Sequence, residues 1–313
     1  RGRRSRRAAR GLRSVLMTKL VECVPNVSEG RRGEVIDRLA DAIRAVEGVR
    51  LLDRTSDVDH NRSVFTFAGP PEPVEAAAHA LVDAAYRAID MRTHTGEHPR
   101  IGAVDVVPFV PLAGTAMEEC VEIAHRFGRA VAERPHVPVY FYARAATRPD
   151  RVRLPDIRRP QYEGLGDVIG TTHVPDAGPS RVHPTAGALV AGARPPLIAF
   201  NIELATPDVS IAKRIAKEIR ESSGGLPAVQ ALGFELTDPP RSQVSMNLLD
   251  LTVTSLGRAW HEVEIRAREA GVEILRGELI GLVPLDAVVE VAAGALKLEG
   301  VTRDRVIEAR LLE

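Results

Sequence analysis

The fold of this chain is decided by the stretch Leu197-Ile198-Ala199-Phe200-Asn201-Ile202-Glu203-Leu204, where an earlier pattern of elements begins a second time. Its run of mainly apolar residues predicts a strand. The elements predicted after it are a helix, two strands, a helix, a strand and a closing helix, over residues 211–219, 229–236, 243–251, 256–267, 272–283 and 285–298. The order strand–helix–strand–strand–helix–strand is that of the ferredoxin-like split βαβ unit.

The first half of the chain has the same order. Its predicted elements are a strand, a helix, two strands, a helix and a strand, over residues 20–24, 35–46, 49–53, 63–68, 73–90 and 103–110. A third helix over residues 120–131 and a strand at 137–143 extend this half. We therefore predict an α+β protein with two ferredoxin-like α/β-sandwich subdomains of similar topology that flank a cleft, each with an antiparallel sheet and helices on one face.

Residues 147–190 interrupt this rhythm, because their six prolines prevent long regular elements. We predict a connector that crosses or lines the cleft, since uncommonly long loops are often functional. The basic, acid-free residues before Met17 are interpreted as upstream or disordered sequence, with a nucleic-acid arm or a targeting peptide as alternatives. The predicted organisation is 1–18 as this segment, 19–190 as the N-terminal subdomain with its connector, and 191–313 as the C-terminal subdomain.

The composition narrows the class of protein. The chain has 42 basic and 42 acidic residues, which argues against a broad nucleic-acid surface. Its two cysteines, Cys23 and Cys120, cannot make a disulfide framework, which predicts a cytoplasmic protein. No run approaches the ~18 apolar residues of a membrane span, so no membrane is expected as a partner. The balanced charge leads us to expect no nucleic acid as a partner either.

Side chains that can move protons or hold anions concentrate in His94-Thr95-Gly96-Glu97-His98-Pro99-Arg100-Ile101-Gly102. The H-x-x-E-H pattern within it matches a zinc hydrolase, in which both histidines bind metal and Glu97 activates water. That site requires a helix, because residues four apart share a face only there. The glycine and the proline oppose a helix, and no third ligand is evident, so no metal is expected.

The favoured interpretation keeps His98 as a free imidazole. A pKa near neutrality would let it accept a proton and return it within one turnover. Glu97 or a backbone carbonyl would orient the ring, and Arg100 would hold a substrate carboxylate through two parallel hydrogen bonds.

The chain resembles the formiminotransferase family over roughly residues 19–300. The strongest match is the segment Gly96-Glu97-His98-Pro99-Arg100-Ile101-Gly102-Ala103. Further matches occur in order along the chain, at residues 20–30, 61–62, 137–140, 178–180, 192–194, 199–202 and 247–250. Many separate matches in order are far more specific than one short motif.

The resemblance implies transfer of the formimino group from N-formimino-L-glutamate to tetrahydrofolate, which gives 5-formiminotetrahydrofolate and L-glutamate in histidine degradation. It also implies two similar subdomains, a homodimer and tetrahydrofolate as co-substrate. No cyclodeaminase part follows in this chain, so we expect a separate enzyme to close the ring.

The family's catalytic histidine falls on His98. Its folate-contacting segment falls on Gly178, Pro179, Ser180, Arg181, Val182, His183, Pro184, Thr185, Ala186 and Gly187. The family pattern has serine, an apolar residue and tryptophan where this chain has Arg181, His183 and Ala186, so pterin contact here departs from the pattern.

The donor is a dicarboxylate with an amidine group, so arginines and amides are expected around it. The candidates for substrate binding are polar side chains of the matched segments: Asn26, Arg62, Glu97, Arg100, Asn201 and Asn247. Three alternatives stay open at this point. They are an N-formyl donor with the same acceptor, a zinc hydrolase, and a folate-binding module without catalysis.

Overall fold

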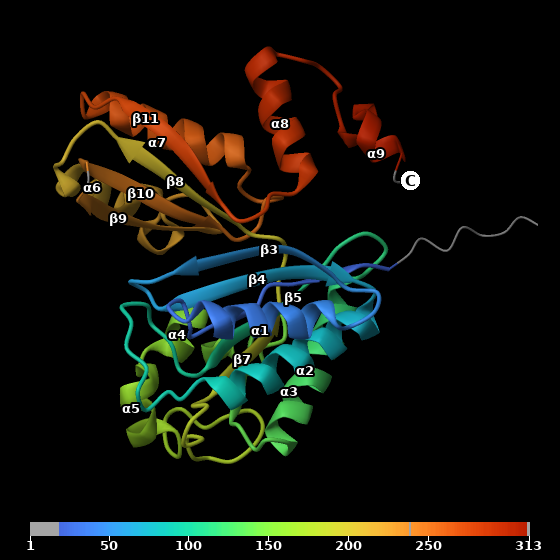
Figure 1. The fold of residues 1–313 in the computed structure, drawn as a ribbon. Helices are drawn as coiled ribbons and strands as arrows, with labels where there is room; N and C mark the ends of the chain where they lie inside the picture. Colours follow the sequence, from blue (N-terminus) through green and yellow to red (C-terminus); the bar gives the residue numbers. More distant parts are fainter. Residues whose placement is uncertain (1–18, 238, 312–313) are drawn as a thin grey trace, which may run out of the picture.

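Two β-sheets organise the computed structural model, which describes residues 19–237 and 239–311 (Figure 1). The predicted segment 1–18 lies outside the described residues. The first sheet contains β1 (Val21–Cys23), β2 (Asn26–Val27), β3 (Arg50–Asp57), β4 (Arg62–Gly69), β5 (Val104–Pro111), β6 (Val139–Ala143) and β7 (Leu189–Ala193). The second contains β8 (Ile198–Leu204), β9 (Val229–Thr237), β10 (Pro240–Leu248) and β11 (Ile274–Ile280). Two mixed α/β subdomains are therefore confirmed.

The six predicted helices form in the predicted order, and α4, α5 and α9 are additional. The first subdomain has α1 (Gly33–Arg44), α2 (Pro71–Ala88), α3 (Met117–Glu133), α4 (Leu154–Arg158) and α5 (Gln161–Val168). The second has α6 (Val209–Ile219), α7 (Leu256–Glu269), α8 (Leu285–Leu296) and α9 (Ile307–Leu311). Three single-turn 3₁₀ helices add to these, at Pro149–Arg151, Glu221–Ser223 and Arg303–Arg305.

The strand order identifies the same unit in both sheets. In the second sheet the order is β11-β8-β10-β9 with antiparallel neighbours, which places the fourth strand beside the first and the third between first and second. In the first sheet, β3 pairs with β4, β4 with β1 and β2, and these with β5, all antiparallel. This is the same order with a split first strand, as the split βαβ pattern predicts.

The prediction of a purely antiparallel first sheet is wrong on one side. β7, from the end of the connector, inserts between β5 and β6 and runs parallel to both. A parallel neighbour requires a long crossover, and the connector supplies it. The predicted subdomain boundary at residue 190 falls inside β7, and the change of sheet occurs between Ala193 and Ile198.

The connector, which the structure describes throughout, contains no long helix or strand before β7, but it does contain two short helices of 5 and 8 residues. It forms α4 and α5, whose Ile157 and Leu165 pack with Tyr140 of β6 and Val190 of β7. These strand residues alternate with those that face α3, so α4 and α5 cover the other face of the sheet. Its prolines are compatible with helices because proline is tolerated in the first helical turn, where Pro155 lies.

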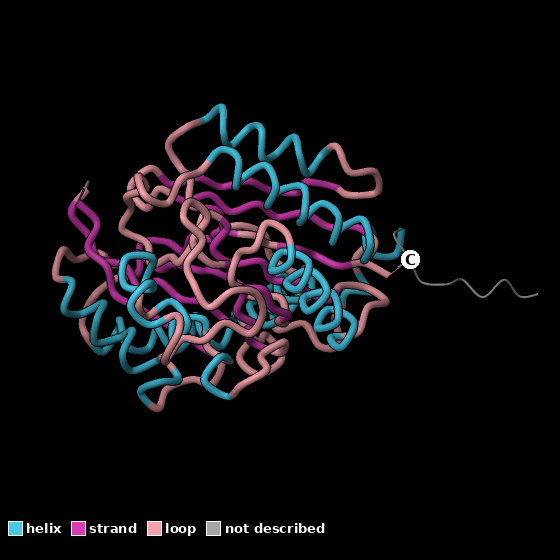
Figure 2. The backbone as a smooth tube through the Cα atoms, turned by 90° about the horizontal axis from the view of Figure 1, so that it is seen from below, coloured by secondary structure: helices cyan, strands magenta, loops and turns pink. Residues whose placement is uncertain are grey.

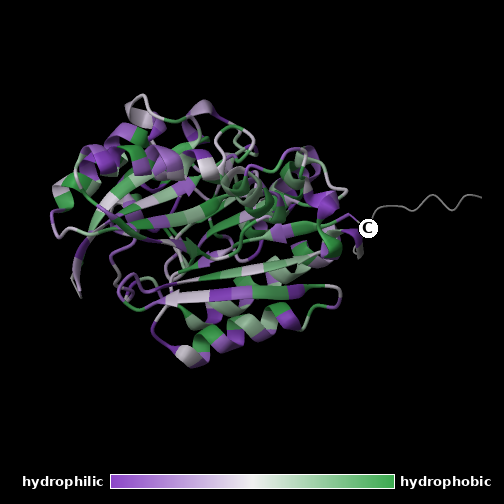
Figure 3. Cartoon of the chain, turned by 90° about the horizontal axis from the view of Figure 1, so that it is seen from above, coloured by the Kyte–Doolittle hydropathy of each residue, from purple (hydrophilic) through white to green (hydrophobic). Residues whose placement is uncertain are grey.

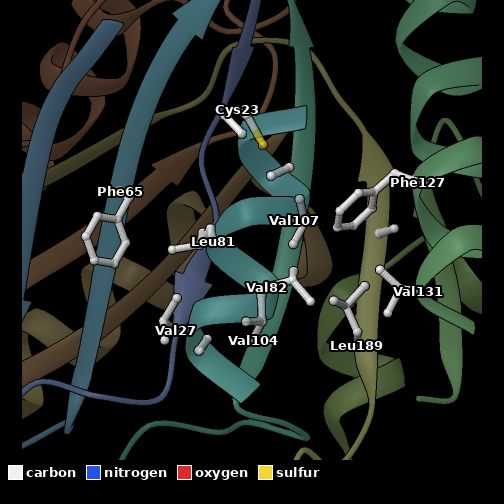
Figure 4. Packing of buried hydrophobic residues seen from close by; sticks show 14 of the residues in the cluster. Cys23, Val27, Phe65, Leu81, Val82, Val104, Val107, Phe127, Val131 and Leu189 are labelled. Atoms are coloured by element: carbon white, nitrogen blue, oxygen red, sulfur yellow. The ribbon is translucent and has the colours of Figure 1, made fainter. Parts of the chain in front are cut away.

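The main core lies between the first sheet and the helices α1, α2 and α3. Leu81 and Val82 of α2 lie over Val107 of β5, and Phe127 of α3 lies beside Leu189 of β7 (Figure 4). Each of these side chains is at most 1% exposed, and such burial stabilises by about 1.5–3 kcal/mol per large apolar side chain. This core makes the first sheet a firm base for the loops at the ends of its strands.

The second subdomain lies on the side of the first sheet away from α1, α2 and α3 (Figure 1). In the view from below, helices lie in front of the strands and cover them (Figure 2). In the view from above, coloured by hydropathy, hydrophobic residues are more frequent on the strands than on the outer loops (Figure 3). The subdomains approach each other at β3, where a Cβ placed on Gly281 would lie 4.0 Å from the Asp53 carboxylate. None of the described helices is long and apolar enough to cross a membrane.

Candidate active site

A small hollow brings together the polar residues of three loops at one end of the strands β2, β4 and β5 of the first sheet. The loops follow β2, join β3 to β4, and join α2 to β5. The residues that line the hollow are Asn26, Val27, Ser28, His60, Asn61, Arg62, His94, His98, Arg100 and Asp105. Of the candidates predicted from the sequence, the hollow includes Asn26, Arg62, His98 and Arg100.

Asn61 holds these loops together. Its side-chain oxygen accepts from the Gly30 backbone N–H at 2.9 Å, and its amide donates to the Thr95 carbonyl at 2.9 Å. Its φ of 48° is left-handed, which asparagine tolerates better than most residues. A Cβ on Gly96 would lie only 2.4 Å from the His60 carbonyl oxygen, so the close approach requires glycine there.

His98 lies in the hollow with both ring nitrogens engaged. Nδ1 lies 2.7 Å from the Pro99 carbonyl, to which it can only donate, so Nε2 is the acceptor and faces Nη1 of Arg62 at 2.5 Å. Burial, with the charges of Arg62 and Arg158, lowers the pKa of His98 to about 3. The predicted pKa near neutrality is therefore wrong, because the imidazole is buried and lies near two cations.

Two polar atoms of the hollow lack partners among the described residues. They are the buried Nε of Arg62 and the buried Oδ1 of Asn26. Burial, and then the charge of Arg158, lowers the pKa of Arg62 to about 10, so it stays charged at neutral pH. Because buried polar groups in proteins are nearly always hydrogen-bonded, an unpaired donor and an unpaired acceptor together favour a polar ligand here.

Arg100 is engaged with protein groups. Its guanidinium pairs with Glu163 of α5 through Nη1–Oε2 at 3.0 Å and Nη2–Oε1 at 2.5 Å. Its Nε donates to Nδ1 of His94 at 3.2 Å, and the residue is 6% exposed. In this structure both prongs of the guanidinium hold α5 to the loop, and the predicted contact with a substrate carboxylate stays a prediction.

Sequence reasoning missed the buried pair of Asp105 and Arg158. Asp105 accepts from the Ile101 backbone N–H at 2.9 Å and forms an ion pair with Arg158 of α4. It thereby fixes the end of the His98 loop to the connector. No local motif marks this pair, because its members are 53 residues apart.

The end of the predicted folate segment lies against the end of this loop. Ala103 donates to the Ala186 carbonyl at 2.9 Å, and Ala188 donates to the Ile101 carbonyl at 2.9 Å. Gly187 has a φ of 74°, and a Cβ there would lie 2.3 Å from the Ile101 carbonyl oxygen. Chain positions nearly ninety residues apart are thus neighbours, while the contact of residues 178–187 with folate stays a prediction.

The other three candidates lie outside the lining of the hollow. Glu97 is exposed on the loop. Asn201 of β8 donates to Glu278 of β11 at 3.1 Å, and Asn247 is exposed on β10. The two asparagines belong to the second sheet, and their contact with substrate stays a prediction.

The geometry required for a zinc hydrolase is not formed. The segment from His94 to His98 is a loop rather than a helix. The ring of His94 is bonded to the Asn61 carbonyl at 3.0 Å and to Arg100. Within the part of the chain that the structure describes, no group of three or more His, Cys, Asp or Glu side chains is placed to hold a metal ion.

A second hollow, of about 410 Å³, lies on the second sheet. At its base the carboxylate of Glu203 is bonded to Arg241 at 3.1 Å and to Arg276 at 2.5 Å. Glu235 and Glu278 also line this hollow, so its charges nearly cancel.

Comparison with known proteins covers both subdomains. The model of the formiminotransferase domain, N-terminal subdomain, matches residues 20–194, and that of the formiminotransferase domain matches residues 199–304. Glutamate formimidoyltransferase of Streptococcus pyogenes serotype M1 is 43% identical over 284 residues, which cover 90% of this chain and 95% of that protein. The protein of the same name from Thermoplasma acidophilum is 45% identical over 295 residues, covering 93% and 97%. Formimidoyltransferase-cyclodeaminase of Rattus norvegicus is 45% identical over 284 residues, covering 88% of this chain and 52% of that protein.

Proposed function

We propose, from the premise that this chain belongs to the formiminotransferase family, that it transfers the formimino group from N-formimino-L-glutamate to tetrahydrofolate. The products are 5-formiminotetrahydrofolate and L-glutamate, as in histidine degradation. The single structural observation that supports the proposal is the pair His98 and Arg62, which lies in a hollow with an unpaired donor and an unpaired acceptor.

Arg62 is the residue proposed to bind a carboxylate of the donor. Its buried Nε has no partner among the described residues, and its Nη1 is held only by a neutral imidazole. A carboxylate forms a stronger, charge-assisted hydrogen bond than an imidazole does. Binding of the donor therefore draws Nη1 away from Nε2 of His98 and places the formimino group beside that nitrogen.

His98 is the residue proposed to take the N5 proton of tetrahydrofolate. When a carboxylate compensates the charge of Arg62, the pKa of His98 rises from its low value, because one of the charges that lowers it is neutralised. The Pro99 carbonyl keeps Nδ1 protonated, so Nε2 carries the lone pair. As N5 attacks the amidine carbon, Nε2 receives its proton. Asn26 would bond the amidine, and the end of residues 178–187 would hold the folate beside it.

Glutamate release from the purified chain tests the proposal. N-formimino-L-glutamate and tetrahydrofolate are supplied together and separately. We expect release only when both are present. Release without tetrahydrofolate would indicate hydrolysis, and no release would leave a folate-binding module as the better description. Competition with N-formyl-L-glutamate then measures the preference for the formimino donor.

We also propose a cytoplasmic homodimer. The family resemblance implies the dimer, and the two cysteines of this chain are free and buried. Val288, Val291 and Leu296 of α8 are 47%, 37% and 69% exposed, and exposed apolar residues on one helix are typical of protein contacts. Sedimentation at several concentrations would measure the mass, and a monomer at all of them would contradict the dimer.

A further inference from the structure

A second imidazole shares the hollow with His98. His60 lies on the turn between β3 and β4, and its ring centroid is 6.1 Å from that of His98, with the ring planes at 66°. The scheme predicted from the sequence uses His98 for both proton transfers. The structure offers a separate group for one of them.

Asp57 contacts Nδ1 of His60, as the carboxylate of a catalytic triad contacts Nδ1 of its histidine. Oδ1 of Asp57 lies 3.0 Å from Nδ1 of His60 and accepts its backbone N–H at 2.7 Å. Partial burial raises the pKa of Asp57, but hydrogen bonds from His60 bring it below its ordinary value, so the carboxylate is charged at neutral pH. A charged carboxylate on Nδ1 both orients the ring and compensates the charge of an imidazolium.

The other nitrogen of His60 is available to a ligand. Its Nε2 makes no hydrogen bond to any residue that the structure describes, and the side chain, which lines the hollow, is 49% exposed. His98 differs in both respects. Its two ring nitrogens are engaged with Pro99 and Arg62, and the residue is half-buried. The two imidazoles are therefore suited to opposite tasks, His98 as a proton acceptor and His60 as a proton donor.

Formimino transfer needs a proton at two different nitrogens of one tetrahedral carbon. N5 loses a proton and the leaving glutamate nitrogen gains one. A proton-transfer group acts from a heavy-atom distance of about 2.6–3.2 Å. Rings with centroids 6.1 Å apart can flank one such carbon, one on the side of each nitrogen.

We propose that His60, held by Asp57, is the proton donor to the leaving glutamate nitrogen, while His98 accepts the proton of N5; this rests on the proposed function. The N5–carbon bond forms, and the C=N pair moves to the imino nitrogen. The electron pair on the imino nitrogen then re-forms the C=N bond. The bond between the carbon and the glutamate nitrogen breaks, and its electrons stay on that nitrogen, which takes the His60 proton. His98 gives its proton to solvent and His60 regains one, so the enzyme returns to its starting state.

The test compares His60→Gln with a matched variant. Glutamine cannot carry the proton, so we expect kcat to fall about 100-fold, as loss of a general acid does, with KM for both substrates within about threefold of wild type. Imidazole added to His60→Ala should restore part of kcat. His261→Gln is the control, because His261 of α7 forms a similar pair with Glu264, at 3.4 Å, outside the hollow. It should keep wild-type kcat.

Each outcome decides between the two proposals. An active wild type with an unchanged kcat in His60→Gln would overturn the role of His60 and leave the single-histidine scheme. A higher KM with unchanged kcat would make His60 a binding residue and would also overturn it. A wild type that transfers no formimino group would overturn both proposals. Thermal melting of each variant shows whether a loss of kcat reflects a loss of fold.

Discussion

The two subdomains share one scaffold, and one difference between them lies in the connection that carries His98. Between the second helix and the fourth strand of the unit, the first subdomain has residues 89–103, which include the His98 loop. At the same place the second has the short turn of residues 270–273 between α7 and β11. The comparison teaches that two copies of one fold can differ in the loops at the ends of their strands, which is where functional residues are most often found.

The first strand of the unit differs in the same way. In the second subdomain β8 is continuous over seven residues, whereas in the first it is split into β1 and β2 at Pro25. The split re-aims Asn26 and Ser28 into the hollow, where Ser28 donates to the Gly102 carbonyl at 2.8 Å. The interruption removes backbone hydrogen bonds between this strand and its neighbours, but it places Asn26 and Ser28 at the hollow.

The largest expected effect comes from removing the imidazole of His98, which lies in the longer connection of the first subdomain. We expect His98→Ala to lower kcat about 1000-fold, because a positioned acid–base group contributes ~10²–10⁴-fold. Steady-state glutamate release measures it. His261→Ala, on α7 of the second subdomain, should leave kcat unchanged. Near-wild-type turnover by His98→Ala would remove His98 from the mechanism.

Glycine substitutions test how tightly the added loops are packed. Gly187 and Gly271 both have left-handed φ values, 74° and 67°, but only Gly187 is crowded. We expect Gly187→Ala to lower the free energy of unfolding by about 3 kcal/mol, and Gly271→Ala by only ~1 kcal/mol. Urea denaturation measures both values. Equal losses would show that the contact with Ile101 relaxes without cost.

Arg62→Gln tests whether the added loops bind the donor. We expect KM for N-formimino-L-glutamate to rise about 10–100-fold, because a hydrogen bond to a charged group is worth ~1.5–3 kcal/mol. KM for tetrahydrofolate should change much less. Arg266→Gln is the control, since Arg266 pairs with Glu218 and Glu262 in the second subdomain. A donor KM unaffected by Arg62→Gln would assign the carboxylate to another residue.

The smallest expected effect is on stability at acidic pH. His98 has a pKa of about 3 in the folded protein against 6.5 for the free side chain, so the unfolded state binds the proton first. Stability is therefore lost as pH falls from about 6.5 toward 3, by at most ~1.4 kcal/mol per pH unit from this group. His98→Gln should flatten that fall in urea denaturation at pH 7, 6 and 5. Identical slopes in both proteins would show that His98 is not buried as a neutral base.

The sequence predicted the parts of the site that depend on local chemistry. Gly96 and Pro99 exclude a helix, and the structure has a loop at His98. The sequence could not predict the ion pairs of Arg100 with Glu163 and of Asp105 with Arg158. In each pair one partner lies in the connector, more than fifty residues away from the other. The sequence also could not predict α4, α5 and β7. These elements are short, and their few apolar residues cannot be told from those of a loop until the elements that they pack against are known.

The sequence by itself determined the duplicated order of elements, because the spacing of apolar residues sets which segments are helices and which are strands. It also determined where the reactive side chains lie along the chain. Only the tertiary structure decided that β7 enters the first sheet, that Arg62 faces His98, and that His60 stands beside it. The physical reason is that strand neighbours, burial and pKa depend on contacts between distant residues, which the local sequence pattern does not encode.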